Sequence, residues 1–289
     1  MHILITDSGV GGLSVCAYAE RYVRTHGFRE PVRLTFANAA PANDYGYNSM
    51  PTRELKIETF DRFLRNINAR SAPDFIYVAC NTLSVLLPDT PFARKPPVPV
   101  QGIIGTAIAR LVREIAPDPR RIAMIFGTQT TIDAGAYPRL LHESGIEVSR
   151  IVSQACPGLA DVISEDREGT KTKREIERWV AAAIAKMPRR GVPVAACLAC
   201  THYGYRRDLF AAALSEAGIE AAVINPNERA VDDLFDDAPP TSRDVIGVEF
   251  VTRYAIPPAT IEALSWFLSD ISPRTVEAMR DFVHAPDLF

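Results

Sequence analysis

Two cysteines, Cys80 and Cys200, occur in matching sequence contexts that could place reactive thiols at equivalent positions. Residues 76–82 and residues 196–202 each form an apolar run that ends in Ala-Cys and continues with two residues able to form hydrogen bonds. The thiolate is the reactive form of cysteine, and a helix N-terminus or a neighbouring His⁺ lowers the thiol pKa from its usual value of about 8.5. The repeated pattern therefore indicates chemistry more strongly than either cysteine would alone.

The spacing of the two cysteines also bears on domain organisation. They lie 120 residues apart, about the length of one domain. This spacing indicates two similar halves, each with one thiol at a strand end. Ligands of open α/β sheets bind beyond the carboxyl ends of the strands. We therefore expect the two thiols to lie on opposite sides of one cleft.

The cysteines could also have structural, metal-binding or redox roles. A Cys at the end of an apolar run is often only a small core side chain, and Cys16 and Cys156 are expected to have that packing role. The pattern Cys197-Leu-Ala-Cys200-Thr-His202 also resembles a zinc-ligand or redox Cys-x-x-Cys motif. On a strand, however, residues 197 and 200 point to opposite faces, which disfavours both.

A glycine-rich turn, Asp-Ser-Gly-Val-Gly-Gly-Leu at residues 7–13, follows the first expected strand and opens the first expected helix. Glycines there let the backbone approach a ligand, and a helix N-terminus attracts an anion such as a carboxylate. The spacing is not that of a dinucleotide or P-loop motif, so nucleotide binding is weakly supported. Asp7 or Ser8 could instead be an ordinary helix N-cap.

Two further polar turns are candidates for binding. Residues 127–131 follow a strand and precede a helix, so their hydroxyls and amides could hold a carboxylate, although Thr130 or Thr131 could simply cap the helix. Residues 44–46 lie in a loop rich in Pro, Asn and Gly, where a turn alone would explain the composition.

Short apolar runs alternate with amphipathic stretches, which predicts α/β architecture with parallel strands covered on both faces. Nine strands exceed the usual sheet size of about 5–6, so two sheets and two domains are favoured. Pro-rich residues 95–99 and 237–240 are expected to be loops. The predicted strands are 2–6, 32–37, 75–79, 98–103, 121–126, 147–152, 194–198, 221–224 and 245–251, and the predicted helices are 13–24, 52–68, 107–115, 132–144, 173–186, 207–217 and 261–268.

Composition limits the class of protein. The 289 residues are 47% hydrophobic and 23% charged, which is typical of a soluble globular chain. A formal net charge of −3 gives no electrostatic reason to bind nucleic acid or an anionic membrane. No apolar run approaches the ~18 residues of a membrane span, and no basic region resembles a signal peptide. Five widely spaced cysteines are a poor disulfide framework, so we expect a cytoplasmic protein with free thiols.

Taken together, the motifs resemble those of the aspartate/glutamate racemase family, and within it most closely the glutamate racemases. The matching segments follow the order of the family from residue 7 to residue 203. They are residues 7–14, 45–46, 79–82, 127–128 with Thr131, 136–137 and 198–203.

The resemblance implies a fold of two pseudo-symmetric α/β domains, each a mostly parallel sheet flanked by helices, with the active site in the cleft between them. It further implies that the chain crosses between the domains twice, near residues 102–106 and 224–227. The first domain would then be discontinuous, comprising residues 1–104 plus 225–289, and the second would comprise residues 105–224. A homodimer is the expected assembly.

The resemblance implies an amino-acid racemase that acts on a small-molecule amino acid and needs no cofactor or metal. Cys80 and Cys200 would be the two bases, assisted by Asp7 and His202 respectively. Stereoinversion needs an acid and a base on opposite faces of one carbon atom, which two opposed thiols would supply. The implied substrate-binding residues are Ser8, Tyr45, Gly46, Asn81, Thr82, Thr128, Thr131 and Thr201.

The sequence departs from the family pattern near these residues. The usual Asp-Thr-Ala-Arg-x-Pro before Tyr45 is replaced by residues 39–44, and the usual Ile-Glu-Pro-Gly by Ile-Gly-Thr-Ala at residues 104–107. Ser164 stands where an acidic residue is expected eight positions after Cys156, with Glu165 beside it. Residues 274–289 are expected to be an added helix and tail.

These departures leave three functions open. The first is racemisation of glutamate, which would supply D-glutamate for peptidoglycan, or of a related acidic amino acid. The second is aspartate racemisation or another racemase or isomerase activity of the family. The third is a catalytically silent relative that serves as a binding or regulatory protein.

Overall fold

The computed structural model describes residues 1–235 and 239–289, and the chain divides into two compact units. Unit 1 comprises Met1–Ile103 with Asn227–Phe289, and unit 2 comprises Ile104–Pro226. Residues 237 and 238 of the second expected Pro-rich loop lie outside the described residues. Among the described residues, none of the helices combines the length and the apolar character that a membrane crossing requires.

Unit 1 is built on a six-stranded sheet of order β10-β9-β2-β1-β3-β4, in which every paired strand is parallel. The central strands β1 and β2 are buried along almost their whole length, since helices cover both faces of the sheet. The strands are β1 (His2–Asp7), β2 (Val32–Asn38), β3 (Phe75–Val78), β4 (Val100–Gly102), β9 (Val245–Thr252) and β10 (Val283–His284).

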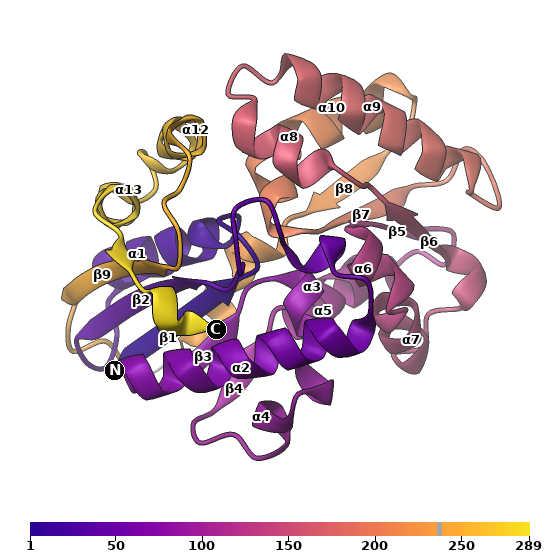
Figure 1. Cartoon of the computed structure of the whole chain (residues 1–289). Coiled ribbons are helices and arrows are strands. Elements are labelled where there is room, and N and C mark those ends of the chain that lie inside the picture. Colours follow the sequence, from indigo (N-terminus) through magenta and orange to yellow (C-terminus); the bar gives the residue numbers. More distant parts are fainter. Residues whose placement is uncertain (236–238) are drawn as a thin grey trace. The chain divides into compact units, whose positions relative to one another are not determined.

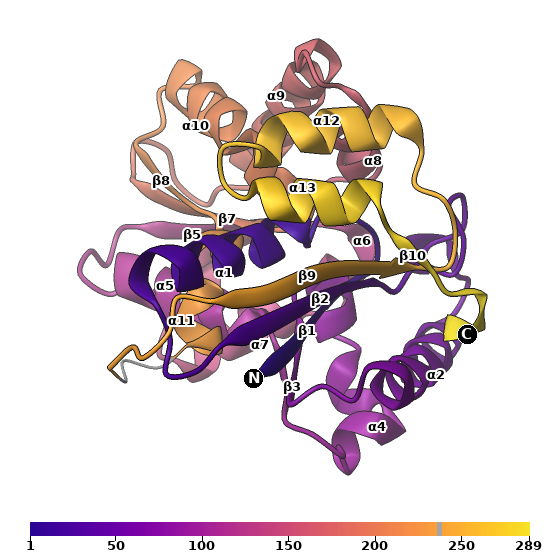
Figure 2. The same ribbon diagram turned by 90° about the vertical axis from the view of Figure 1, so that its left-hand side faces the viewer.

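Helices lie on both sides of the unit 1 sheet, with α1, α12 and α13 on one side and α2 and α4 on the other (Figure 2). Helix α2 starts where the Thr52 hydroxyl accepts a hydrogen bond from the Leu55 amide, and it buries Phe60, Phe63, Leu64 and Ile67, one face of a helix. The helices of this unit are α1 (Leu13–His26), α2 (Arg53–Ser71), α3 (Asn81–Ser84), α4 (Pro91–Arg94), α11 (Val231–Leu234), α12 (Pro258–Leu268) and α13 (Pro273–Arg280).

Unit 2 is built on a four-stranded parallel sheet of order β6-β5-β7-β8 (Figure 1). The core between this sheet and helices α8, α9 and α10 contains the rings of Phe126, Tyr203 and Phe210. The strands are β5 (Ile122–Gly127), β6 (Ile151–Ala155), β7 (Val194–Ala199) and β8 (Ala221–Ile224), and the helices are α5 (Ile104–Ile115), α6 (Gln129–Asp133), α7 (Ala136–Glu143), α8 (Leu159–Glu165), α9 (Thr170–Ala185) and α10 (Arg207–Glu216).

The predicted α/β class with two mostly parallel sheets is confirmed, but one predicted strand is displaced. The segment predicted as strand 147–152 begins with a 3-10 turn at Val148–Arg150, and β6 starts only at Ile151. The buried guanidinium of Arg150 donates hydrogen bonds to the carbonyls of Ile115, Asp118 and Arg121. These bonds hold the turn in a conformation that the apolar pattern of the segment does not reveal.

One predicted helix is two helices. The stretch 132–144 is divided between α6 and α7, because Gly135 adopts a φ of 62° that ends the first helix before the second begins. Helix α8 was not predicted, since seven residues are too few for a convincing apolar period.

The C-terminal tail completes unit 1. Helix α13 is followed by β10, in which Val283 pairs with Val251 of β9 at the edge of the sheet. The last residue, Phe289, packs its ring 5.5 Å from that of Phe63 on α2. The expected added helix and tail is therefore an integral part of this unit.

Candidate functional site

The carboxyl edge of the unit 1 sheet brings together Asp7, Ser8 and Cys80. Strand β1 ends at Asp7, and the Ala79 amide donates to the Thr6 carbonyl at 2.9 Å, which continues the pairing of β1 with the chain beyond β3. The next residue, Cys80, has its Sγ 3.0 Å from the Ser8 Oγ. The structure thus places a carboxylate, a hydroxyl and a thiol at neighbouring strand ends.

A close approach by the start of α1 fixes the position of Asp7. Gly12 has φ −68° and ψ −7°, which any residue can adopt. A Cβ at this position would lie 2.8 Å from the Asp7 Cβ, 2.9 Å from its Oδ2 and 3.2 Å from the Ala79 Cβ. Glycine is therefore required here by lack of space and not by backbone conformation.

The electrostatics of Cys80 favour the neutral thiol. Burial raises the pKa of Cys80 to about 12, and the negative charge of Asp7 acts in the same direction. The hydrogen bonds with Ser8 and from the Leu83 amide, 3.4 Å from Sγ, lower the pKa but do not offset burial. The thiol is therefore protonated at neutral pH, with the Asp7 carboxylate near it.

The other predicted site residues of unit 1 lie either directly after Cys80 or in the loop that follows β2. Asn81 and Thr82 form the first turn of α3, directly after the thiol, and both are buried. Tyr45 lies in the loop after β2, where its side chain is 40% exposed. Gly46 precedes the 3-10 turn Tyr47–Ser49, with open space around it.

Two tyrosines of unit 1 near the cluster were missed by sequence analysis. Tyr254 follows β9, and its Oη accepts a hydrogen bond from the Asn38 amide nitrogen at 3.1 Å. Burial raises the pKa of Tyr254, and the charge of Asp7 raises it further. Tyr47 is fully buried, and its pKa is raised by burial and, when Cys80 is a thiolate, by the negative charge of that thiolate. No motif marks either residue.

The corresponding edge of unit 2 carries a second thiol. Cys200 follows β7, whose last residue, Ala199, is the register partner of Gly127 at the end of β5. The next residue, Thr128, caps α6 by accepting from the Thr131 amide at 3.3 Å, and the two hydroxyls are 3.0 Å apart. The strand ends therefore place Cys200 and the threonine pair at the same edge of the sheet.

The residues after Cys200 form a 3-10 turn, Thr201–Arg206. Thr201 is buried, and burial lowers the pKa of His202 to about 4. The imidazole is therefore neutral at pH 7 and able to accept a proton. The Tyr203 hydroxyl donates to the Cys156 carbonyl at 3.1 Å, which joins this turn to the end of β6.

The remaining cysteines have other surroundings. Cys197 is fully buried within β7, where it interacts with Tyr137, and Cys16 and Cys156 are buried as expected of packing residues. All five cysteines, each in the described part of the chain, are free. Across residues 1–235 and 239–289, no group of three or more His, Cys, Asp and Glu side chains could hold a metal ion.

Helix α8 has Ser164 at the position where the family pattern predicts an acidic residue, but it carries another carboxylate at Asp161. The Ser164 hydroxyl donates to the Ala160 carbonyl at 3.0 Å, so it is committed within α8. Asp161 lies one helical turn earlier, and its charge raises the pKa of Tyr203. Burial and the charge of Glu165 in turn raise the pKa of Asp161. A carboxylate is thus present near the turn after Cys200, three residues before the expected position.

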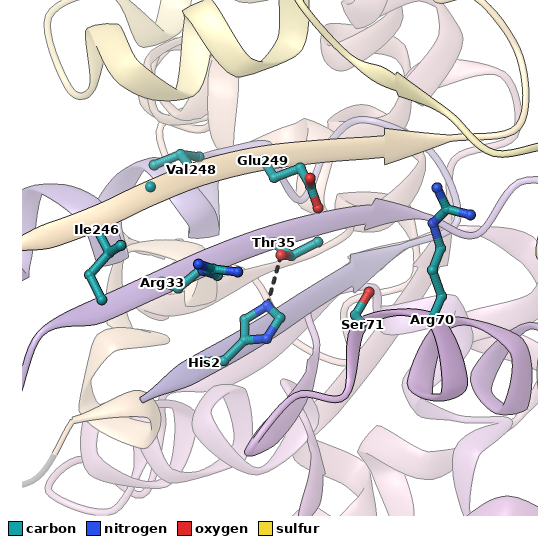
Figure 3. Close-up of a pocket in the computed structure, with 9 residues that line it drawn as sticks. His2, Arg33, Thr35, Arg70, Ser71, Ile246, Val248 and Glu249 are labelled. Carbon is teal, nitrogen blue, oxygen red and sulfur yellow. Dashed lines mark hydrogen bonds between the residues drawn. The ribbon is translucent and has the colours of Figure 1, made fainter.

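A polar pocket of about 560 Å³ lies elsewhere in unit 1 (Figure 3). Its walls come from the amino-terminal parts of β1, β2 and β9 and from the end of α2, and His2 Nε2 lies 2.8 Å from Thr35 Oγ1 within it. None of the predicted site residues lines it. Since α/β sheets bind ligands at the opposite, carboxyl ends of their strands, this pocket is not the candidate site.

Comparisons with known proteins agree with the motifs. Residues 4–234 match the family described as Asp/Glu/Hydantoin racemase. A glutamate racemase from Aquifex aeolicus is 31% identical over 205 residues, which cover 70% of this chain and 71% of the relative. A glutamate racemase from Thermus thermophilus is 30% identical over 217 residues, which cover 73% and 70%.

Solved structures show the same fold. A glutamate racemase from Bacillus anthracis superposes with a TM-score of 0.73 and 20% identity, covering 92% of this chain and 93% of that chain. A glutamate racemase from Campylobacter jejuni gives a TM-score of 0.71 at 20% identity, covering 92% and 98%.

Proposed function

Since the chain belongs to the Asp/Glu/hydantoin racemase family, we propose that it inverts the α-carbon of an acidic amino acid, with glutamate as the first candidate substrate. The observation that carries this proposal is the cluster of Asp7, Ser8 and Cys80, with Ser8 Oγ and Cys80 Sγ 3.0 Å apart. Unit 2 supports it with a second thiol, Cys200, at the carboxyl end of its own sheet and two residues before His202, whose imidazole is neutral.

In the proposed reaction one thiolate removes the α-proton and the other thiol delivers a proton to the opposite face. The Cα–H bond breaks and leaves its electron pair on the α-carbon. A new Cα–H bond then forms as an S–H bond breaks, so the roles of the two sulfurs are exchanged. The mechanism requires that the two units present Cys80 and Cys200 to opposite faces of one α-carbon.

Asp7 and His202 assist at their respective thiols. The Cys80 thiol, with its pKa of about 12, must lose its proton before it can act as a base. Asp7 can receive that proton, and the α-ammonium group of an arriving substrate favours the thiolate by its positive charge. At Cys200, the neutral imidazole of His202 can accept the thiol proton in the same way.

Hydroxyl and amide donors at both edges support binding of a dicarboxylic substrate. We assign this role to Ser8, Asn81 and Thr82 in unit 1, with Tyr45 and Gly46 in the adjoining loop. Thr128, Thr131 and Thr201 would have it in unit 2. Such donors also stabilise the negative charge that develops on the substrate during proton removal. The altered residues 39–44 and 105–107 make aspartate the second candidate substrate.

The wider setting follows from the same family resemblance. Proton transfer by two thiols needs no cofactor, and a glutamate racemase would supply D-glutamate for peptidoglycan. We propose a homodimer, and the five free cysteines support a reducing compartment such as the cytoplasm.

The test is isotope exchange in D2O with each enantiomer of glutamate and aspartate. We expect α-deuterium incorporation and inversion with at least one acidic amino acid, measured by mass spectrometry and chiral chromatography. Absence of exchange with all four would contradict a racemase function and favour a silent relative.

A further inference from the structure

The pocket of Figure 3 lies on a face of the unit 1 sheet that carries polar side chains. The register places His2 of β1 beside Arg33 of β2. Two residues further along the same face, Thr35 of β2 lies beside Glu249 of β9. Parallel strands that are covered on both faces are ordinarily apolar, so packing of the sheet does not account for this row of charged and polar groups.

Two irregularities of the backbone border the pocket. Helix α2 ends at Ser71, which lines the pocket, and Ala72 then adopts a left-handed conformation with φ 42°, the one such non-glycine residue in the described part of the chain. The pairing of β2 with β9 shifts register between Val32 and Arg33, where Ile246 is an extra residue. Bulges and left-handed non-glycine residues are concentrated near functional sites. Helix α2 thus ends beside the pocket instead of covering it.

Opposite charges line the pocket without neutralising each other. Within residues 1–235 and 239–289, neither the guanidinium of Arg33 nor the carboxylate of Glu249 forms an ion pair or a hydrogen bond. Their Cα atoms lie on neighbouring strands, offset by two residues, which corresponds to about 8 Å. One small molecule could therefore contact both side chains. Arg70 adds a second cation, whose pair with Asp287 at 3.3 Å is a weak surface contact because Asp287 is 69% exposed.

We propose that this pocket binds a free amino acid, whose α-carboxylate pairs with Arg33 and whose α-ammonium group pairs with Glu249. Charge-assisted hydrogen bonds of this kind are the strong ones. A simple anion would be repelled by Glu249, whereas an amino acid satisfies both charges. Arg70 favours an acidic side chain on the ligand. The pocket volume of about 560 Å³ lies within the range of about 300–1,000 Å³ that is usual for small-molecule sites.

This site is separate from the carboxyl edge of the sheet, and the proposal does not depend on the proposed function. His2 and Asp7 are the two ends of β1, five residues or roughly 16 Å apart. A ligand in the pocket would therefore leave the cluster around Asp7 unoccupied. The protein would recognise an amino acid at this end of the strands whether or not the other end inverts one.

His2 provides a reporter that belongs to the pocket. Its Nε2 lies 2.8 Å from Thr35 Oγ1, and its pKa is lowered, chiefly by burial, so the imidazole is neutral at pH 8. Its NMR resonances at that pH therefore respond to a ligand and not to protonation. The probe is α-methylglutamate, which has no α-proton and cannot be racemised by proton transfer. We expect a saturable shift of the His2 resonances, and resonances that do not move would overturn the proposal.

Arg33→Gln tests the carboxylate contact. Both Arg33 and Glu249 are exposed, so substitutions there should not disturb folding. Losing a charge-assisted hydrogen bond should weaken binding of α-methylglutamate about 10- to 100-fold. The matched control is Arg62→Gln, which removes the same charge from α2, where Arg62 pairs with Glu58 at 3.0 Å, and it should change binding less than about twofold. Equal effects of the two substitutions would mean that only net charge matters, which would contradict the proposal.

Glu249→Gln distinguishes an amino acid from a simple anion. It should weaken binding of α-methylglutamate about tenfold, because the ammonium group loses its partner. It should not weaken binding of glutarate, which has both carboxylates but no ammonium group. If the two probes responded alike, Glu249 would not recognise the ammonium group and the proposal would be wrong. Since no turnover is measured, these results hold whether or not the protein racemises any amino acid.

Discussion

Gly12→Ala tests the close approach that positions Asp7. The new Cβ would lie 2.8 Å from the Asp7 Cβ, whereas ordinary contact begins near 3.4 Å, so strand β1 or the start of α1 must move by about 0.6 Å. Overpacking of this kind costs roughly 1–3 kcal/mol, and the smaller entropy of the unfolded alanine chain offsets about 0.4–1 kcal/mol. We expect a net loss of roughly 1–2 kcal/mol. Because a 1 Å misplacement near the chemistry can cost about 100-fold, a shift of this size should lower kcat about tenfold.

The assay combines thermal unfolding with the rate of α-deuterium exchange. Gly247→Ala is the matched control, since a Cβ there meets nothing within 4 Å, and it should leave the rate unchanged and raise stability by about 0.4–1 kcal/mol through the unfolded-state entropy alone. If Gly12→Ala matched this control in both measurements, the reasoning about Asp7 would be wrong.

Three further predictions follow from the electrostatics and hydrogen bonds. Ser8→Ala removes a hydrogen bond that lowers the pKa of Cys80, so the alkylation rate of Cys80 at pH 9 should fall; an unchanged rate would contradict the 3.0 Å contact. His202 has a folded pKa of about 4, below its unfolded value near 6.5, so the unfolded state binds more protons and stability falls as the pH falls through this window. The loss is at most about 3 kcal/mol, and His202→Gln should abolish that part of the slope in urea unfolding at pH 4–7. Tyr254→Phe removes an acceptor from Asn38 and should cost about 1 kcal/mol in the same measurement, while no loss would mean that this bond contributes nothing.

The elements that could be predicted are those with a clear apolar pattern. Strand β7 is a continuous apolar run, so its end before Cys200 was evident from the sequence. The same reasoning placed Cys80 at a strand end, and the structure shows it as the N-cap of α3, which is too short to have its own period. Strand β10 has two residues, and its pairing with β9 depends on the tertiary position of α13. Local sequence does not contain that information.

The candidate site likewise contains residues that the sequence predicted and residues that it did not. Asp7, Ser8 and Cys80 occur in motifs of several residues, and the structure brings them together through the parallel register of β1 and β3. Tyr47 and Tyr254 are single aromatic residues in loops, and such residues are more often packing groups. Their proximity to the charged groups depends on how the loop after β2 and the end of β9 fold back, which no local pattern specifies.

The most direct test of the two-thiol mechanism follows each enantiomer separately in Cys80→Ala and Cys200→Ala. With one thiol left, a proton can leave and return on one face only. Each variant should therefore lose racemisation, retain α-deuterium exchange without inversion for one enantiomer, and the two variants should retain it for opposite enantiomers. Two-way racemisation that survives in both variants would contradict the assignment of Cys80 and Cys200 as the two bases.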